Sequence, residues 1–252
     1  MKIASWNVNS LKVRLEHVQN WLNENQPDVL CLQETKTEDA NFPLQAIQQV
    51  GYNAIFSGQK TYNGVAIISK TEATDIQYGL PNFEDVQKRL IAATVNNIRI
   101  VCVYIPNGES TESDKYQYKL AWLSALQEWL KQELLRYPRL TILGDYNIAP
   151  EDLDVHNPVA WADKVLVSEP ERTAFKKLIE LGLRDTFRLF EQPEKSFSWW
   201  DYRMMGFRRN HGMRIDHILI SQTIECSASG IDKTPRKLER PSDHTPVWAE
   251  VV

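Results

Sequence analysis

Cysteine, long apolar runs and net charge are all scarce in this chain of 252 residues, and each scarcity narrows the class of protein. The three cysteines, Cys31, Cys102 and Cys226, lie in separate apolar stretches without Cys-x-x-Cys spacing. They predict small core side chains in a reducing compartment rather than a disulfide framework or a zinc site. No apolar run approaches the roughly 20 residues of a membrane span, and the N-terminal MKIASWNVNSL lacks the apolar segment of a signal peptide. We therefore expect a soluble, cytoplasmic protein without a membrane partner.

The net charge is small because 29 basic residues oppose 33 acidic ones, which leaves −4 and a pI near 5.8. An acidic balance ordinarily argues against a polyanionic partner such as nucleic acid. If Glu34, Asp145, Asp216 and Asp243 all face one site, however, the rest of the molecule is electrically neutral. A divalent cation bound among them would also reverse the local sign. The overall charge therefore does not exclude nucleic acid.

The segment around which the chain is organised is residues 140–150, LTILGDYNIAP. Apolar and β-branched residues lead into Gly144, and two polar residues follow before Pro150, which predicts a buried strand that ends in a polar loop. In an extended backbone the side chains of Asp145 and Asn147 would point to the same side. The carboxylate could accept a proton while the amide holds a phosphate oxygen. Taken alone, the segment favours an ordinary Asx turn instead.

Polar residues recur where other apolar runs end, and this recurrence favours the functional interpretation. They are Asn7 after residues 2–6, Gln33 and Glu34 after 29–32, Tyr104 and Asn107 after 98–103, Arg214 and Asp216 around Ile215, and Ser242, Asp243 and His244 before 246–251. A site assembled from both ends of the chain predicts one domain over residues 1–252. For Glu34 alone, pairing with Lys36 or Arg14 remains an equal alternative to a functional role.

Apolar patterning predicts an alternation of strands and helices. Strands are expected at residues 2–8, 28–33, 52–57, 64–70, 90–95, 98–105, 140–144, 215–220, 224–231 and 246–251, and helices at 11–26, 42–50, 114–137 and 168–182. Asn96-Asn97 predicts a hairpin turn, Ser168 with Glu171 a capping box, and the loop from Gly58 to Gly64 a hairpin rather than a phosphate cradle. The fold class is α/β or mixed α+β.

Residues 198–216, SWWDYRMMGFRRNHGMRID, differ in composition from the rest of the chain. Aromatic residues alternate with Arg203, Arg208, Arg209 and Arg214, a combination that suits a nucleic-acid backbone and an unstacked nucleotide. The alternative is a core segment whose arginines are solvated. We favour binding because the segment has neither a strand period nor a helix period.

The polar strand ends also predict a chemistry. Glu34, Asp145, Asp216 and Asp243 offer oxygen ligands without any zinc-type cluster, which indicates a hard cation, Mg²⁺ or Mn²⁺. With Asn7, Asn147, Tyr104 and His244 added, the set fits metal-assisted hydrolysis of a phosphoester. Neighbouring residues of an extended chain point to opposite sides, so Asp243 cannot hold His244 at a shared ligand. Asp216 is the expected partner, and it would keep the imidazole protonated at neutral pH.

Several segments, in order, resemble the exonuclease III family of apurinic/apyrimidinic endonucleases within the endonuclease/exonuclease/phosphatase superfamily. They are SWNVNSL, PDVLCLQETK, GYNAIFSGQKTYNGVAIISK, YIPNGES, GDYNIAP, FSWWDYR, GMRIDHILIS and PSDHTPVW, and together they span nearly the whole chain. The resemblance implies a deoxyribonuclease I-like, four-layer α/β sandwich of two packed mixed sheets with helices outside. It also implies a Mg²⁺-dependent DNA repair phosphodiesterase, with Mn²⁺ as a substitute, that acts on double-stranded DNA with abasic sites, nicks or 3′ blocks. We expect a monomer.

The resemblance further implies a role for individual residues. Glu34 would be the principal metal ligand, with Asn7 beside it and Asp243 near the metal. Asp145 would position the attacking water, and Asn147 and Tyr104 would contact the phosphate. His244, paired with Asp216, would stabilise the transition state. The residues expected to bind substrate are Trp199, Met213 and Ile215 in an abasic-sugar pocket, together with Asn107, Arg203, Arg208, Arg209 and His156.

His156, in the loop that follows the central segment, leads to a more specific hypothesis. A bulky side chain there could narrow the space for an extrahelical sugar, so 3′-end processing as exonuclease or 3′-phosphatase could exceed incision at abasic sites. Two alternatives remain at this level. One is a phosphoesterase of the same superfamily acting on an inositol phosphate or lipid head group, and the other is a DNA-binding module without catalysis.

Overall fold

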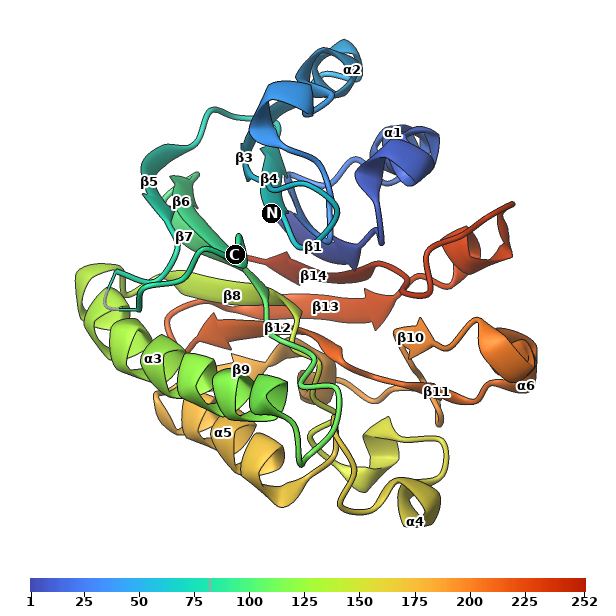
Figure 1. The fold of residues 1–252 in the computed structure, drawn as a ribbon. Coiled ribbons are helices and arrows are strands. Elements are labelled where there is room, and N and C mark those ends of the chain that lie inside the picture. The colour runs from blue at the N-terminus through green and yellow to red at the C-terminus, as the bar shows by residue number, and fades with distance from the viewer. Residues whose placement is uncertain (82) are drawn as a thin grey trace.

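The computed structural model describes residues 1–81 and 83–252, which form two packed six-stranded sheets (Figure 1). Sheet A has the strand order β13 (Cys226–Ile231), β14 (Val247–Val251), β1 (Lys2–Asn7), β2 (Val29–Gln33), β4 (Val65–Ser69), β3 (Asn53–Ser57). Sheet B has the order β5 (Thr74–Tyr78), β6 (Leu90–Val95), β7 (Ile98–Tyr104), β8 (Leu140–Asp145), β12 (Asp216–Ser221), β9 (Leu183–Asp185). The pairs β1–β2 and β7–β8 are parallel, and the other neighbours are antiparallel.

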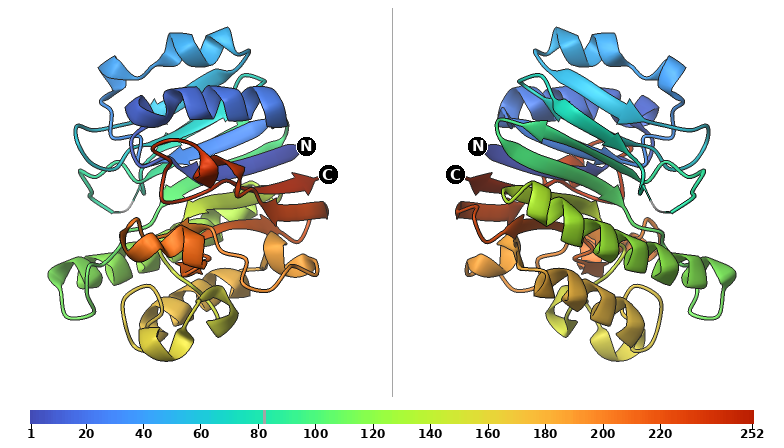
Figure 2. Two further views of the ribbon diagram at one scale, coloured as in Figure 1. Left: turned by 90° about the vertical axis from the view of Figure 1, so that its right-hand side faces the viewer. Right: turned by 90° about the vertical axis from the view of Figure 1, so that its left-hand side faces the viewer.

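Helices cover the outer face of each sheet, so that four layers result (Figure 2). α1 (Leu11–Asn25) and α2 (Leu44–Gln49) lie on sheet A, whereas α3 (Asp114–Arg136) and α5 (Glu169–Glu180) lie on sheet B. The smaller elements are α4 (Pro158–Trp161), α6 (Gly206–Arg209), the ribbon of β10 (Trp199–Trp200) with β11 (Gly212–Met213), and the 3-10 turns Asp39–Asn41, Asp152–Asp154, Thr186–Leu189, Arg203–Met205 and Thr234–Lys237.

Successive side chains of a strand point to opposite faces of its sheet, so each strand contributes to the core between the sheets and to the core under the helices. On β2, Val29 and Cys31 point into the core between the sheets, while Leu30 and Leu32 point outward toward α1. β7 divides in the same way, because its even-numbered residues from Ile98 to Cys102 join the central core and the others pack under α3. Strands that are buried on both faces need apolar residues at every position. The continuous apolar runs in the sequence reflect this requirement.

The α/β architecture with two mixed sheets confirms the predicted fold class, and the long helices and most strands lie within two residues of their expected bounds. β5 and β9 were not predicted. β5 is an edge strand with the polar sequence TDIQY and mostly exposed side chains, so it carries no alternation signal. β9 has only three residues, and the short helices α4 and α6 have four each, which is too few for a period to be seen.

The predicted turn and cap signals are confirmed. Asn96 and Asn97 join β6 to β7 with φ values of 49° and 63°, the left-handed backbone that a two-residue hairpin requires. At the start of α5, the side chains of Ser168 and Glu171 each accept a hydrogen bond from the other residue's main-chain N–H. The segment from Gly58 to Gly64 connects the antiparallel strands β3 and β4, as a hairpin loop does.

The expectations about membrane spans and about cysteines can also be compared with the structure. Throughout the described residues, no helix combines the length and apolar character needed to cross a membrane. Cys31 and Cys102 are buried in the central core as free thiols, whereas Cys226 is only half-buried at the start of β13.

Candidate active site

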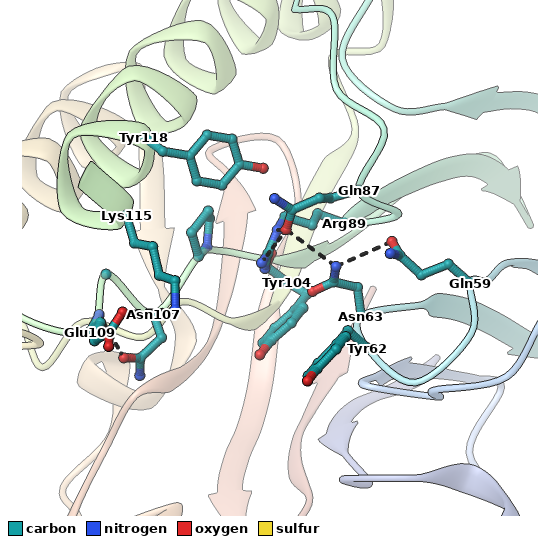
Figure 3. A pocket seen from close by; sticks show the side chains of 12 residues that line it. Gln59, Tyr62, Asn63, Gln87, Arg89, Tyr104, Asn107, Glu109, Lys115 and Tyr118 are labelled. Carbon is teal, nitrogen blue, oxygen red and sulfur yellow. Dashed lines mark hydrogen bonds and ion pairs between the residues drawn. The ribbon is translucent and has the colours of Figure 1, made fainter. Parts of the chain in front are cut away.

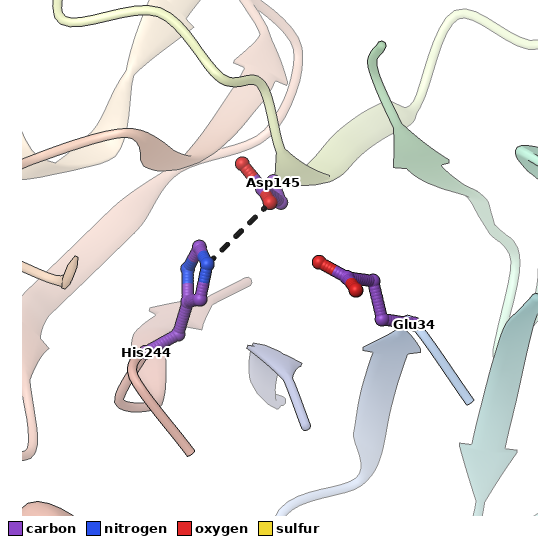
Figure 4. A group of neighbouring side chains, drawn as sticks. All are labelled: Glu34, Asp145 and His244. Atoms are coloured by element: carbon purple, nitrogen blue, oxygen red, sulfur yellow. Dashed lines mark ion pairs between the residues drawn. The ribbon is translucent and has the colours of Figure 1, made fainter. Parts of the chain in front are cut away.

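One edge of the two sheets collects polar side chains from widely separated parts of the sequence. The parallel pairs β1–β2 and β7–β8 bring the carboxyl ends of four strands to this edge, and the antiparallel strand β12 begins there. In the strand register Asp145 has Tyr104 on one side and Asp216 on the other. The loop that leads into β14 adds His244 to the same edge, as Figure 4 shows. Topology therefore explains why the polar strand ends meet.

Glu34 lies directly after β2 and is tied to its surroundings. Its carboxylate accepts a hydrogen bond from Asn7 Nδ2 at 2.8 Å and forms an ion pair with Lys36 Nζ at 2.8 Å. Arg14, the other expected partner, instead donates to main-chain carbonyls, including that of Asn9. Glu34 has φ 50°, a left-handed backbone that residues with a Cβ rarely adopt. Both interpretations of Glu34, as an ion-pair partner and as a site residue, therefore apply. Its carboxylate pairs with Lys36 and also lies near Asp145 and His244.

Asp145 and Asn147 do converge, but not by the predicted route. Asn147 has φ 50° and is not extended. The chain turns instead, so that Asn147 N donates to Asp145 Oδ1 at 2.9 Å and Asn147 Nδ2 lies 3.2 Å from Asp145 Oδ2. Asn107 Nδ2 then donates to Asn147 Oδ1 at 2.9 Å. The extended-backbone argument was wrong, and the Asx turn is itself the device that assembles the site.

The imidazole of His244 is held by the carboxylate of Asp216. Its Nδ1 lies 2.9 Å from Asp216 Oδ2, and its Nε2 lies 3.7 Å from Asp145 Oδ2 (Figure 4). Ser198 Oγ donates to Asp216 Oδ2 at 2.7 Å and accepts the main-chain N–H of Asp216, which fixes that carboxylate. The predicted pairing of His244 with Asp216 is confirmed.

Burial and charge set the protonation of these groups. Burial opposes a charge on His244, but Asp216 and then Asp145 outweigh it and raise the imidazole pKa to about 10. Burial raises the pKa of Asp145 to about 7, although the positive His244 acts in the opposite direction. Burial, with Glu34 and Asp145 nearby, raises the pKa of the Tyr104 phenol well above its ordinary value. At neutral pH the site therefore contains an imidazolium, a neutral phenol and a carboxylate able to exchange a proton.

A metal ion would find oxygen ligands at this edge. Among the described residues, ligand atoms of Glu34, Asp145 and His244 lie within 4.8 Å of one another. A protonated imidazole cannot coordinate a cation, so His244 does not fit as a ligand. The two carboxylates supply oxygen ligands suited to a hard divalent cation, and Asn7 Nδ2 holds them together by donating to Glu34 at 2.8 Å and to Asp145 at 2.9 Å.

Asp243 and Trp199 form a second wall of the site. Asp243 accepts hydrogen bonds from Asn9 Nδ2 at 2.9 Å and Trp199 Nε1 at 3.0 Å. Burial opposes ionisation of Asp243, but the charge of His244 and these bonds outweigh it and lower its pKa below the ordinary value. Asn9 and Ser198 were not predicted as site residues. Asn9 lies two residues beyond Asn7, whereas nothing in the sequence around Ser198 indicates its role.

The residues expected to form a sugar pocket are closely packed. Met213 and Ile215 are 0% and 1% exposed and belong to one apolar cluster with Val155 and the half-buried Trp199. His156 follows Val155 of this cluster, and its main-chain N–H and its Nδ1 both lie within hydrogen-bonding distance of the Gly212 carbonyl. Its ring also stacks on His211, with centroids 4.9 Å apart and an interplanar angle of 12°.

The arginines of residues 198–216 divide into two groups. Arg203, Arg208 and Arg209 are exposed around α6, and Arg203 pairs with Asp201. Arg214 is instead 1% exposed, with ion pairs to Asp154 at 2.6 Å and Asp185 at 2.7 Å. Both sequence interpretations of Arg214, as a nucleic-acid contact and as a solvated side chain, were wrong, because two buried carboxylates take up its charge.

A cavity of about 700 Å³ adjoins the site next to Tyr104 and Asn107 (Figure 3). Tyr104 and Asn107 form part of its wall, and Lys115 and Arg89 supply positive charge. The Arg89 guanidinium lies 4.7 Å from the centre of the Tyr104 ring, so it restrains that phenol. The cavity therefore extends the polar edge beyond the residues that the sequence indicated.

Comparison with known proteins gives a consistent result. Residues 4–244 match the model of the Endonuclease/Exonuclease/phosphatase family. The chain is 38% identical to exodeoxyribonuclease III of Haemophilus influenzae, with 99% of each chain covered. The 3′ phosphatase NExo from Neisseria, solved with a product DNA hairpin, superposes with a TM-score of 0.98 at 46% identity and covers 100% of this chain and 99% of that one. An AP endonuclease from Archaeoglobus fulgidus superposes with a TM-score of 0.95 at 40% identity, with 99% and 98% covered. The chain therefore belongs to the endonuclease/exonuclease/phosphatase family.

Proposed function

We propose that this exonuclease III-type hydrolase is a Mg²⁺-dependent DNA repair nuclease that mainly processes 3′ ends of double-stranded DNA. It would remove 3′-phosphates and terminal nucleotides, and would cut 5′ to abasic sites more slowly. The observation that carries the preference is the packing of His156 against Gly212 and His211, next to the closed cluster of Met213 and Ile215. The structural similarity to a 3′ phosphatase of Neisseria supports the same preference.

The chemistry follows from the protonation states of the site. Asp145, with a pKa raised to about 7, can orient a water and accept its proton near neutral pH. The imidazolium of His244 faces Asp145 from 3.7 Å, where it would neutralise negative charge that builds up on the phosphate. Asn107 would donate its second amide hydrogen to a phosphate oxygen. Asn147 donates to the Ile105 carbonyl at 3.0 Å and to Asp145 Oδ2 at 3.2 Å, and it would redirect the second of these hydrogens to the phosphate when substrate binds. Tyr104 acts as a neutral donor in this scheme, because its pKa is raised rather than lowered.

The metal would be held mainly by Glu34, with Asn7, Asp145, Asn147 and Asp243 around it. When bound, Mg²⁺ would supply Lewis-acid stabilisation of the phosphate charge, and Mn²⁺ would substitute for it. Lys36 competes for the Glu34 carboxylate at 2.8 Å, so it would have to share or release that oxygen. The positive side chains near the site, Arg89, Lys115, Arg203, Arg208 and Arg209, would contact the DNA backbone.

Incision at abasic sites is the second candidate activity. The similarity to an AP endonuclease of Archaeoglobus fulgidus favours it, as does Trp199, which is only half-buried beside Asp243. A phosphoesterase for inositol phosphates or lipid head groups is disfavoured, because the relatives described above are named as enzymes of DNA. A single-domain monomer over residues 1–252 is our working proposal for the assembly, and light scattering tests it.

The deciding experiment is a time course with Mg²⁺ on two labelled duplexes. One carries an internal abasic site, and the other carries a nick that ends in a 3′-phosphate. Faster removal of the 3′-phosphate would support the proposal. Faster incision of the abasic duplex would overturn the preference while leaving the nuclease intact, and hydrolysis of neither would contradict the proposed function.

A further inference from the structure

The two amide side chains at the site hang from loops rather than from strands. Asn107 lies beyond the end of β7, and Asn147 lies beyond the end of β8 in a left-handed backbone with φ 50°. Their side chains are hydrogen-bonded to each other at 2.9 Å. The two loops are joined near their start, because Ile105 N donates to the Asp145 carbonyl at 2.9 Å and Asn147 Nδ2 donates to the Ile105 carbonyl at 3.0 Å. Neither Asn107 nor Asn147 is itself paired in a strand.

Lys119, which the mechanism above does not use, lies beneath both loops. It projects from α3 with a side chain that is 0% exposed. Its Nζ donates to the main-chain carbonyl of Asn107 at 3.1 Å and to that of Asn147 at 2.6 Å. Its stem supports the first loop, because a Cβ added to Gly108 would lie 3.3 Å from Lys119 Cδ.

The third donor of Lys119 is anchored to a different helix. Nζ also donates to the Glu171 carboxylate, which accepts the main-chain N–H of Leu166 at 3.0 Å and that of Ser168 at 3.1 Å. Glu171 lies in the first turn of α5, which packs beside α3 (Figure 1). All three N–H groups of the ammonium are therefore used.

We propose that Lys119 is a positioning residue for the phosphodiesterase reaction, because its ammonium clamps the main chains of Asn107 and Asn147 and so places both amides at the phosphate. The inference rests on the proposed function, since it takes Asn147 and Asn107 to be phosphate contacts. Glu171 serves to keep the ammonium charged and pointed at the two carbonyls. Lys119 itself touches no substrate.

Removal of Lys119 alone would leave the Glu171 carboxylate buried without a partner, so the variant could fail to fold. The test therefore uses the neutral pair Lys119→Met/Glu171→Gln, which removes the clamp and the unpaired charge together. A matched control exists on the same helix. Arg99 and Glu133 form another buried ion pair at 2.6 Å, at the far end of α3, and Arg99→Met/Glu133→Gln removes it in the same way.

The assay measures kcat and KM for removal of a 3′-phosphate at a nick, with Mg²⁺. We expect Lys119→Met/Glu171→Gln to lower kcat roughly 10- to 100-fold through misplacement of the amides, with KM changed less than about threefold. The control pair should lower the unfolding temperature without a comparable loss of kcat. In the protein without Mg²⁺, the side-chain amide NMR signals of Asn107 and Asn147 should shift only in the Lys119 variant.

A folded Lys119→Met/Glu171→Gln protein with wild-type kcat and unshifted amide signals would overturn the inference. Equal losses of kcat in the two double variants would also overturn it, because stability alone would then explain the effect. If the Lys119 pair does not fold while the control pair does, Lys119 serves the fold rather than the amides, and the proposal fails. Absence of turnover by the wild-type enzyme would count against the proposed function instead.

Discussion

The Nδ1 atom of His244 lies 2.9 Å from Oδ2 of Asp216, and this pair joins the loop before β14 of sheet A to the first residue of β12 of sheet B, 28 residues earlier in the sequence. Ser198 Oγ donates a hydrogen bond of 2.7 Å to the same carboxylate oxygen and so fixes it. The buried carboxylate thereby keeps the imidazole charged, which burial alone would prevent. The positive charge that we assign to the reaction thus depends on a residue that does not itself contact the phosphate.

Replacement of that carboxylate should change the pH dependence of the reaction. Asp216→Asn removes the largest charge that raises the pKa of His244, so this pKa should fall from about 10 toward or below neutrality. We expect kcat to drop roughly 100-fold and to decline further as the pH rises from 6 to 9. Wild-type kcat should show no alkaline decline over that range. An unchanged pH profile in the variant would contradict the assignment of His244 as a cation.

Metal binding should be visible without any assay of activity. Because a ligand that binds only the folded state stabilises it, added Mg²⁺ should raise the unfolding temperature in a concentration-dependent way. Glu34→Gln should abolish most of this rise, because it weakens the principal proposed ligand and its contact with Lys36. Chelation should remove the effect in the wild-type protein. An equal rise in Glu34→Gln would place the metal elsewhere.

Sequence periodicity predicted the strands, the long helices and the α/β or α+β class, because it depends only on which faces of a strand or helix are buried, whereas the four layers came from the family resemblance. The pairing of Asp216 with His244 was also predictable, since adjacent side chains on an extended chain cannot face one ligand. Arg214 was not predictable. Its partners Asp154 and Asp185 lie 60 and 29 residues away in sequence, and nothing local distinguishes an arginine in a buried ion pair from an exposed one.

The backbone conformation of loops was the other feature that sequence periodicity did not predict. The functional interpretation placed Asn147 in an extended backbone, but its φ of 50° places it in the turn that the residue types alone had favoured. The roles of Ser198 and Lys119 likewise arise only when distant segments pack, because their partners include Asp216 and Glu171. The chemistry of the side chains at the strand ends could be predicted, whereas the residues that hold those side chains in position could not.

The substrate preference should respond to the side chain at position 156. His156→Gly removes the ring that stacks on His211 while leaving the main-chain hydrogen bond to Gly212 available. We expect the ratio of abasic incision to 3′-phosphate removal to rise about tenfold, the low end of the roughly 10- to 200-fold discrimination that a small steric change in a substrate pocket produces. His211→Ala is the matched control for loss of the stack alone. No gain in incision by His156→Gly would end the obstruction hypothesis.

DNA affinity should depend on salt in proportion to the phosphate contacts. Binding to a nicked duplex in Ca²⁺, which slows turnover, should weaken as salt rises, with a log–log slope of about −0.9 per contact. The double variant Arg208→Ala/Arg209→Ala should reduce the magnitude of that slope by up to about two contacts. Lys237→Ala/Arg240→Ala, which removes two cations of the loop before β14, provides a comparison of equal charge. Equal changes of slope in both variants would show that Arg208 and Arg209 have no specific role.

The buried His217 should make folding stability fall in acid. Burial, and then the charge of Arg214, lower its pKa to about 3, and the neutral ring accepts from Arg214 at 3.0 Å and donates to the Ile148 carbonyl at 2.8 Å. In the unfolded chain its pKa returns to about 6.5. Below that pH the unfolded state binds a proton that the folded state does not, so this contribution is full above pH 6.5 and is lost as the pH falls toward 3.

Between pH 7 and pH 5 the loss from this one group should be about 2 kcal/mol in the free energy of unfolding. His217→Gln keeps a donor near Ile148 but cannot titrate, so its stability should fall less over the same interval. Urea denaturation of both proteins at several pH values measures the difference, and the subtraction removes the other titrating groups. Parallel profiles would mean that His217 has the same pKa in the folded and unfolded states, so that neither burial nor Arg214 lowers it.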